Sequence, residues 1–191
     1  MKILKMLLVL FIFAPSVTFA QKALYPNFPE TFEQPDTAAK GHYKKADVTL
    51  KSGDWNLDQA ILGALTNHDR FNPSGKQSIR MQQNRSKPAY LEMNFDLNEG
   101  ASKVTVAYAS YYKDEPCVWR LEYSLDQGLS WKQAGQDVKA ESKELTTAEF
   151  NVDVKGKVRF RINKLGLGDG KADPSIKNGR LSIDDIAIYK N

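Results

Sequence analysis

Residues 90–97 read Tyr-Leu-Glu-Met-Asn-Phe-Asp-Leu, and from Leu91 onward an apolar residue alternates with a polar one. Successive side chains of a β-strand point to opposite faces, so this pattern predicts a strand with one buried face and one wet face. Similar short runs follow one another along the chain, at residues 43–50, 55–62, 79–82, 104–111, 118–123, 130–134, 150–154, 158–163 and 181–189. About ten short strands separated by turns predict an all-β fold, a two-sheet antiparallel β-sandwich of the jelly-roll type.

The first twenty residues are typical of a secretory signal peptide. Lys2 and Lys5 precede an apolar run over 6–14, and Ala20 provides a small residue at the expected cleavage point before Gln21. The run is too short to span a bilayer, which takes about 20 residues. The cleavage point has no neighbouring cysteine for lipid attachment. We therefore expect a signal peptide over 1–20, a leader over 21–27 and a sandwich domain over 28–191, in a secreted, periplasmic or cell-surface protein.

Charge and cysteine content exclude some classes of protein. Without residues 1–20 the chain has 25 basic against 23 acidic side chains, and the basic ones are spread along it. This distribution does not favour a nucleic-acid partner. Cys117 is the only cysteine, so the chain has no internal disulfide, and its place at the start of a strand predicts a small buried hydrophobic residue.

Residues 124–131, Ser-Leu-Asp-Gln-Gly-Leu-Ser-Trp, have the spacing of an Asp-box, the hairpin turn of sialidases and related β-proteins. In such a turn Asp126 accepts backbone N–H groups, Gly128 takes a positive φ, and Trp131 packs the turn onto the sheet. A sialidase propeller needs several copies, and this chain has one. The motif therefore predicts a structural turn, with glycan contact as the alternative.

Residues 181–189, Leu-Ser-Ile-Asp-Asp-Ile-Ala-Ile-Tyr, change phase in the middle of the strand. Leu181 and Ile183 share one face, whereas Ile186 and Ile188 would fall on the other, so we expect a β-bulge at Asp184–Asp185. Two adjacent carboxylates in an apolar strand are costly to bury without a partner. Either Ca²⁺ binds them, or one faces solvent while the other accepts backbone N–H groups.

The order of several short motifs carries a resemblance across about residues 28–190. These are Glu-Thr-Phe-Glu at 30–33, Ser-Gly-Asp-Trp at 52–55, Gly-Lys-Gln-Ser-Ile-Arg at 75–80, Leu-Glu-Tyr-Ser at 121–124 and Ile-Asp-Asp-Ile at 183–186. This order resembles a jelly-roll domain of secreted Gram-negative proteins, and it is similar in outline to MAM domains and galactose-binding-like carbohydrate-binding modules. The resemblance implies that the first and last strands are adjacent, with a structural calcium ion between them. Its expected ligands are Glu33 and Asp185, followed by Glu30 and Asp184.

Three further side chains are candidates for ligand binding, namely Arg80, Tyr111 and Tyr112. Aromatic rings stack on sugars, but they also fill sandwich cores, and adjacent residues of a strand point to opposite faces. Only one of the two tyrosines can therefore be in the core. Arg80 either contacts a ligand or pairs with a carboxylate on a neighbouring strand. We expect Trp55 and Trp119 to be packing residues.

Catalytic motifs are missing from the sequence. It has two histidines, and it lacks a Gly-x-Ser-x-Gly elbow, a His-Glu-x-x-His site and a phosphate-binding glycine loop. We therefore expect a protein that is not an enzyme, a secreted or surface module that binds an extracellular glycan. The alternatives are a structural or adhesive domain that binds a surface protein, and a small extracellular hydrolase.

Overall fold

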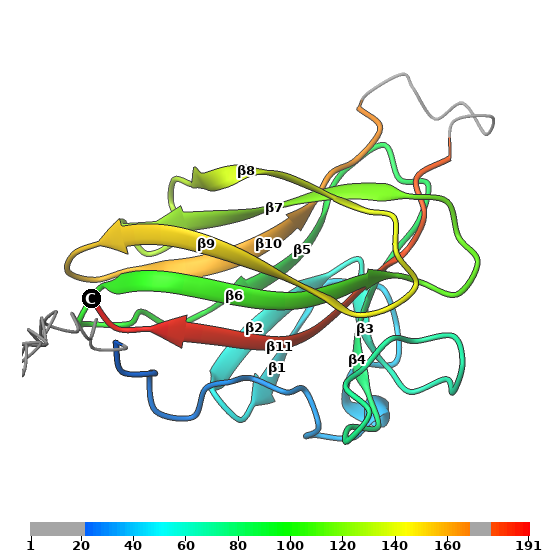
Figure 1. The fold of residues 1–191 in the computed structure, drawn as a ribbon, viewed down its shortest axis with the longest axis horizontal. Coiled ribbons are helices and arrows are strands. Elements are labelled where there is room, and N and C mark those ends of the chain that lie inside the picture. Colours follow the sequence, from blue (N-terminus) through cyan, green and yellow to red (C-terminus); the bar gives the residue numbers. More distant parts are fainter. Residues whose placement is uncertain (1–21, 169–176) are drawn as a thin grey trace, which may run out of the picture.

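A computed structural model describes residues 22–168 and 177–191, and the predicted signal peptide lies outside these described residues. Within them, eleven strands form two antiparallel sheets that pack face to face (Figure 1). The six-stranded sheet has the order β1-β2-β5-β10-β7-β8, and the five-stranded sheet has the order β3-β4-β11-β6-β9. The strands are β1 (Ala46–Leu50), β2 (Gly53–Asp58), β3 (Ala60–Gly63), β4 (Ser78–Met81), β5 (Ala89–Met93), β6 (Ala101–Ser110), β7 (Cys117–Ser124), β8 (Lys132–Ala140), β9 (Thr146–Val154), β10 (Arg159–Lys164) and β11 (Leu181–Tyr189).

The core lies between the two sheets and confirms the predicted β-sandwich. Apolar side chains of both sheets are buried there, among them Leu91 of β5 and Ile183 of β11. Trp119 of β7 is fully buried and meets Phe150 of β9 edge-on at 5.7 Å between ring centroids. Its indole therefore ties the six-stranded sheet to the five-stranded one, as expected for a packing residue.

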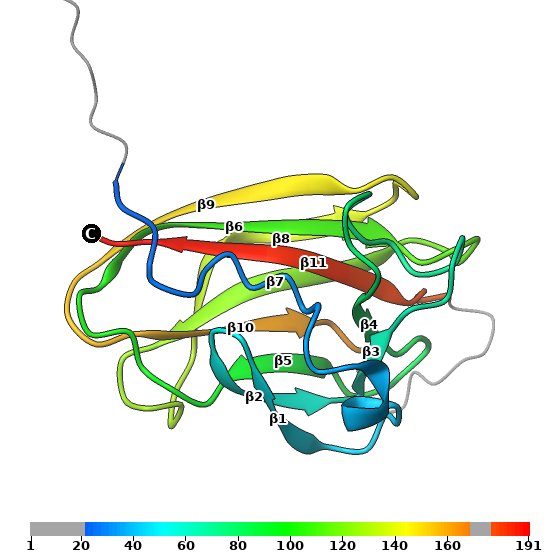
Figure 2. The ribbon, with the colours of Figure 1, turned by 90° about the horizontal axis from the view of Figure 1, so that it is seen from below.

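The N-terminal segment closes one side of the sandwich. Glu30 and Ile186 of β11 exchange two backbone hydrogen bonds, of 2.8 and 2.9 Å. Phe32 is fully buried and packs edge-on against Trp55 of the six-stranded sheet, so the segment contacts both layers. In Figure 2 the segment runs beside β11 and then past the β1–β2 hairpin. The expected adjacency of the beginning and end of the domain is confirmed, and Leu24, within the predicted leader, also pairs with β11.

The phase slip in the last strand is a bulge, as the sequence predicts. The register of β11 against β6 shifts between Asp184 and Ile186, and Asp185 has a φ of 37°. The extra residue returns Ile186 and Ile188 to the core, where they join Ile183.

Residues 55–62 differ from the sequence prediction of a single strand. They form the end of β2 and most of β3, which belong to different sheets. Gln59 lies between them with a φ of 56°, so the chain turns there without the glycine or proline that usually marks such a turn. Within the described residues, helical structure is limited to the single turn Thr37–Lys40. No helix in these residues is long and apolar enough to cross a membrane.

Candidate binding surface

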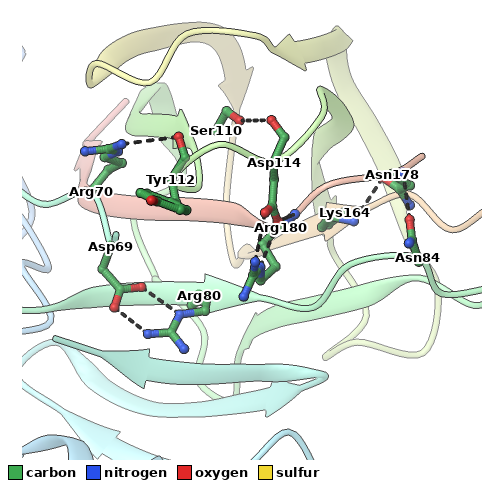
Figure 3. Close-up of polar contacts among 10 residues, drawn as sticks. All are labelled: Asp69, Arg70, Arg80, Asn84, Ser110, Tyr112, Asp114, Lys164, Asn178 and Arg180. Carbon is green, nitrogen blue, oxygen red and sulfur yellow. Dashed lines mark hydrogen bonds and ion pairs between the residues drawn. The ribbon is translucent and has the colours of Figure 1, made fainter. Parts of the chain in front are cut away.

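The structure brings Arg80 and Tyr111 together at one end of the five-stranded sheet. The guanidinium carbon of Arg80 lies 4.8 Å from the Tyr111 ring centroid, and that of Arg180 lies 4.0 Å from it. Arg80 also forms an ion pair with the carboxylate of Asp69 (Figure 3). The Tyr111 ring is only 3% exposed. Arg80 thus takes the carboxylate-pairing role that the sequence left open, and Tyr111 is a buried ring between cations.

Tyr112 is partly exposed whereas Tyr111 is buried, although both residues lie in the turn after β6 and not in a strand. Its ring is partly exposed and lies against His68, with 4.1 Å between ring centroids. Its φ of 44° places it in the left-handed region, just after the end of β6. The carbonyl of Tyr112 accepts a hydrogen bond from Nη2 of Arg70 (Figure 3). Tyr112 therefore belongs to a loop cluster beside Tyr111.

The four predicted metal ligands fall into two groups. Glu30 is fully buried, and its carboxylate accepts hydrogen bonds from the backbone N–H of Phe32 and from the N–H and hydroxyl of Ser52. These donors balance its charge, so its role is to fasten the N-terminal segment to the β1–β2 turn. Both oxygens of Glu33 accept the backbone N–H of Lys76.

Asp184 and Asp185 lie together under the loop that joins β3 and β4. Asn72 donates its backbone N–H to Asp184 and its side-chain amide to Asp185. Oδ1 of Asp184 is buried without a hydrogen-bond partner. Burial, with smaller contributions from Asp185 and Glu33, raises the pKa of Asp184 to about 7. Within the described ranges, no three His, Cys, Asp or Glu side chains form a group that could hold a metal ion.

A row of polar side chains crosses the outer face of the six-stranded sheet. Arg161 of β10 stands directly opposite Glu92 of β5 on one side and Glu122 of β7 on the other. Nε of Arg161 lies 2.6 Å from Oε2 of Glu122, and Nη1 lies 3.3 Å from Oε2 of Glu92. The amide of Asn163 donates to the second oxygen of Glu122 at 2.8 Å. These contacts lock the row into one geometry.

Two aromatic rings flank the centre of this row. The guanidinium carbon of Arg161 lies 4.4 Å from the ring centroid of Tyr90 and 4.2 Å from that of Trp131. Both rings are partly exposed, unlike Trp55 and Trp119, which are buried. We name the Arg161 surface as the outer-face residues Tyr90, Glu92, Glu122, Trp131, Arg161 and Asn163.

The Asp-box turn places Trp131 on the Arg161 surface. Asp126 accepts the backbone N–H of Ser130, Gly128 has a φ of 91°, and the Trp131 indole donates to the Gly128 carbonyl at 3.0 Å. Hydrogen bonds from Ser130 and Ser124 lower the pKa of Asp126 to about 2. The predicted structural turn is confirmed. It also holds a partly exposed indole over a guanidinium, which the motif alone does not indicate.

The Arg161 surface is not apparent from the sequence. Residues 92, 122 and 161 come from three strands far apart in the chain, and they meet only because β10 lies between β5 and β7. The sequence does indicate that Glu92 and Arg161 face solvent, because each occupies a polar position in an alternating strand. It does not indicate that they are neighbours.

Cys117 shows the environment that the sequence predicts. Its side chain is 3% exposed, and burial raises the pKa of the thiol to about 11. A thiol with this pKa is protonated at neutral pH and therefore a poor nucleophile.

Known proteins share this fold at low sequence identity. The chain is similar to the CBM22-1 xylan-binding domain of Xyn10C from Paenibacillus barcinonensis, with a TM-score of 0.52, 11% identity, and coverage of 90% of this chain and 97% of that one. It is also similar to the K2 cleaved adhesin domain of Lys-gingipain, with a TM-score of 0.53, 14% identity, and coverage of 84% and 98%. No protein-family model matches the chain, and no curated protein matches it significantly. These similarities confirm the jelly-roll sandwich.

Proposed function

We propose that this chain is a non-catalytic, exported glycan-binding module, and that the Arg161 surface holds the sugar. The observation that carries the proposal is the placement of Arg161 between Tyr90 and Trp131, in a row with two carboxylates. Partly exposed rings offer apolar faces for sugar rings, and Arg161 and Glu92, with side chains 16% and 24% exposed, offer donors and acceptors for hydroxyls. The xylan-binding domain with a similar fold supports a glycan as the ligand class.

The preformed geometry of the Arg161 surface favours binding. Side chains already held by ion pairs and ring contacts lose little conformational entropy when a ligand arrives. Both neighbours of Arg161 across the sheet are acidic, so its charge is balanced before any ligand binds. With two carboxylates to one guanidinium, the row carries one excess negative charge, so it suits a neutral sugar chain better than an acidic one.

A glycan array tests this proposal. The chain from Gln21 onward should bind at least one class of neutral glycan, and Trp131→Ala should weaken that binding about tenfold, as expected for losing roughly 1.4 kcal/mol of ring contact. Tyr112→Ala is the matched control, because it removes a half-exposed ring outside the Arg161 surface. Loss of binding in Tyr112→Ala alone would move the site to the loop cluster and contradict the proposal.

A second candidate function is adhesion to a surface protein. Leu125 and Leu129, in the Asp-box turn, are 52% and 89% exposed. Large apolar side chains this exposed are suited to contact with another protein. An array without any glycan signal, together with a captured surface protein that is lost in Leu129→Ser, would favour adhesion over glycan binding.

We also propose a structural calcium ion beside the bulge of β11. The unpartnered, buried Oδ1 of Asp184 and the adjacent carboxylate of Asp185 supply oxygens of the kind that a hard cation takes, and backbone carbonyls would complete the set. Glu30 and Glu33 do not fit, because backbone N–H groups already occupy their carboxylates. Bound calcium would neutralise the carboxylates under the β3–β4 loop. Calcium should therefore raise the melting temperature of chelator-treated protein. An unchanged melting curve would contradict the proposed calcium site.

A further inference from the structure

A cavity opens between the β3–β4 loop and the β8–β9 loop. Its volume is about 470 Å³, and its lining includes Asn67, Arg70, Phe71, Lys143 and Leu145. We call it the Arg70 pocket. It shares Pro73 and Leu145 with a groove of about 350 Å³ over β6, β9 and β11. The two hollows therefore form one path along the outer face of the five-stranded sheet.

Arg70 has a guanidinium without a carboxylate partner among the described residues. Five other arginines, at positions 80, 120, 159, 161 and 180, each form an ion pair. Nη2 of Arg70 donates to the Tyr112 carbonyl at 3.3 Å, and Nε is buried with no partner. With Nε buried and one Nη2 hydrogen bound to the Tyr112 carbonyl, Nη1 and the second Nη2 hydrogen are the donors left for a carboxylate or sulfate, which can accept two parallel N–H bonds.

The other charges in the pocket do not cancel that of Arg70. Asp69 also lines the pocket, but its carboxylate is bound by Arg80 and by the backbone N–H of Leu65. Lys143 and Glu144 lie side by side on the opposite loop and offset each other. The pocket therefore keeps one uncompensated positive charge.

The backbone that carries Arg70 is fixed in place. Its N–H donates to the hydroxyl of Ser182 in β11, and two residues later the N–H of Asn72 donates to Asp184. Phe71, between these two anchors, gives the pocket a partly exposed apolar wall. A fixed cation beside an aromatic ring matches a ligand that has an acidic group on an apolar ring face.

We propose that the Arg70 pocket binds an acidic sugar unit, one with a carboxylate or a sulfate, within a longer glycan. Arg70 holds the acidic group and Phe71 contacts the ring. The neighbouring groove, lined by Thr105, Ala107, Thr147 and the carboxylate of Asp185, accepts the adjoining units. The ligand class rests on the proposed glycan binding, whereas the site itself is separate from the Arg161 surface.

Titration with four probes tests the proposal, namely a galacturonic acid oligosaccharide, its carboxyl-reduced neutral counterpart, a sulfated galactan oligosaccharide and inorganic sulfate. We expect at least one acidic oligosaccharide to bind at least tenfold more tightly than the neutral one. Arg70→Gln should weaken this binding tenfold or more, whereas Lys103→Gln, the same charge change outside the pocket, should leave it within twofold. Equal binding to Arg70→Gln and wild type would overturn the proposal. So would sulfate competing at the same concentration, which would mean an adventitious ion only.

Amide shift mapping on the unaltered chain makes the test independent of how Arg70→Gln folds. The acidic oligosaccharide should shift residues 66–71 and 143–145 and leave the Trp131 indole signal in place. Shifts at Trp131 instead would assign acidic glycans to the Arg161 surface and overturn this inference. If neutral glycans fail to bind anywhere while residues 66–71 still shift, the proposed function of the Arg161 surface fails and the Arg70 pocket stands.

Discussion

Replacing Arg161 with glutamine should destabilise the fold far more than an ordinary surface substitution. The Arg161 side chain is 16% exposed and its partner Glu122 is 10% exposed, so the ion pair is largely buried. The substitution removes one short charge-assisted hydrogen bond, worth about 1.5–3 kcal/mol, and two ring contacts, worth roughly 0.5–1 kcal/mol each. It also leaves Glu92 and Glu122 facing a neutral group. We expect a loss of about 3 kcal/mol in the free energy of unfolding.

Urea denaturation at pH 7 measures this loss, and the melting temperature should fall by on the order of 10 °C. Arg120→Gln is the matched control, because Arg120 pairs with Asp137 on the same sheet with side chains 28% and 40% exposed. An ion pair this exposed is worth less than about 1 kcal/mol. Adding Glu122→Gln to Arg161→Gln should restore part of the loss. The reasoning is refuted if Arg161→Gln costs no more than Arg120→Gln.

Three further predictions concern other parts of the fold. In chelator-treated protein, the free energy of unfolding should fall as pH rises from about 4 to above 7, because Asp184, with a pKa raised to about 7, holds its proton more tightly in the folded state. Urea titrations at several pH values should show that the free energy of unfolding of Asp184→Asn depends less on pH. The same pH dependence in the variant and the wild type would contradict the raised pKa. Phe32→Ala should lower the free energy of unfolding, measured by urea denaturation, by about 3–5 kcal/mol, because the ring is fully buried against Trp55. A loss below about 1 kcal/mol would show that the fold does not need the N-terminal segment. Thiol reagents should leave Cys117 of the native protein unmodified at pH 7, as mass spectrometry would show, and rapid labelling would contradict its burial.

Local patterns in the sequence predict much of the fold because they depend on single strands. The phase slip at Asp184–Asp185 predicts the bulge, and the Asp-box spacing predicts the turn around Asp126 and Gly128. The adjacency of the N-terminal segment and β11 follows from the order of motifs, and the pairing of Glu30 with Ile186 confirms it.

The binding surface is harder to predict because it depends on which strands are neighbours. Alternation places Arg161 on a wet face, but it does not reveal that Glu92 and Glu122 lie on either side of it. The turn at Gln59 was missed for a related reason, since a positive φ at a glutamine has no local sequence signal. Tyr111 is a candidate for ligand binding in the sequence, but in the structure its ring is buried between two arginines.

The most direct test of the account is amide shift mapping with the strongest neutral glycan from the array. We expect the shifts to gather on the outer face of β5, β10 and β7, at Tyr90, Arg161 and Glu122, and at the Trp131 indole. Shifts confined to the loops around Tyr112 and His68, with the sheet face unchanged, would contradict it.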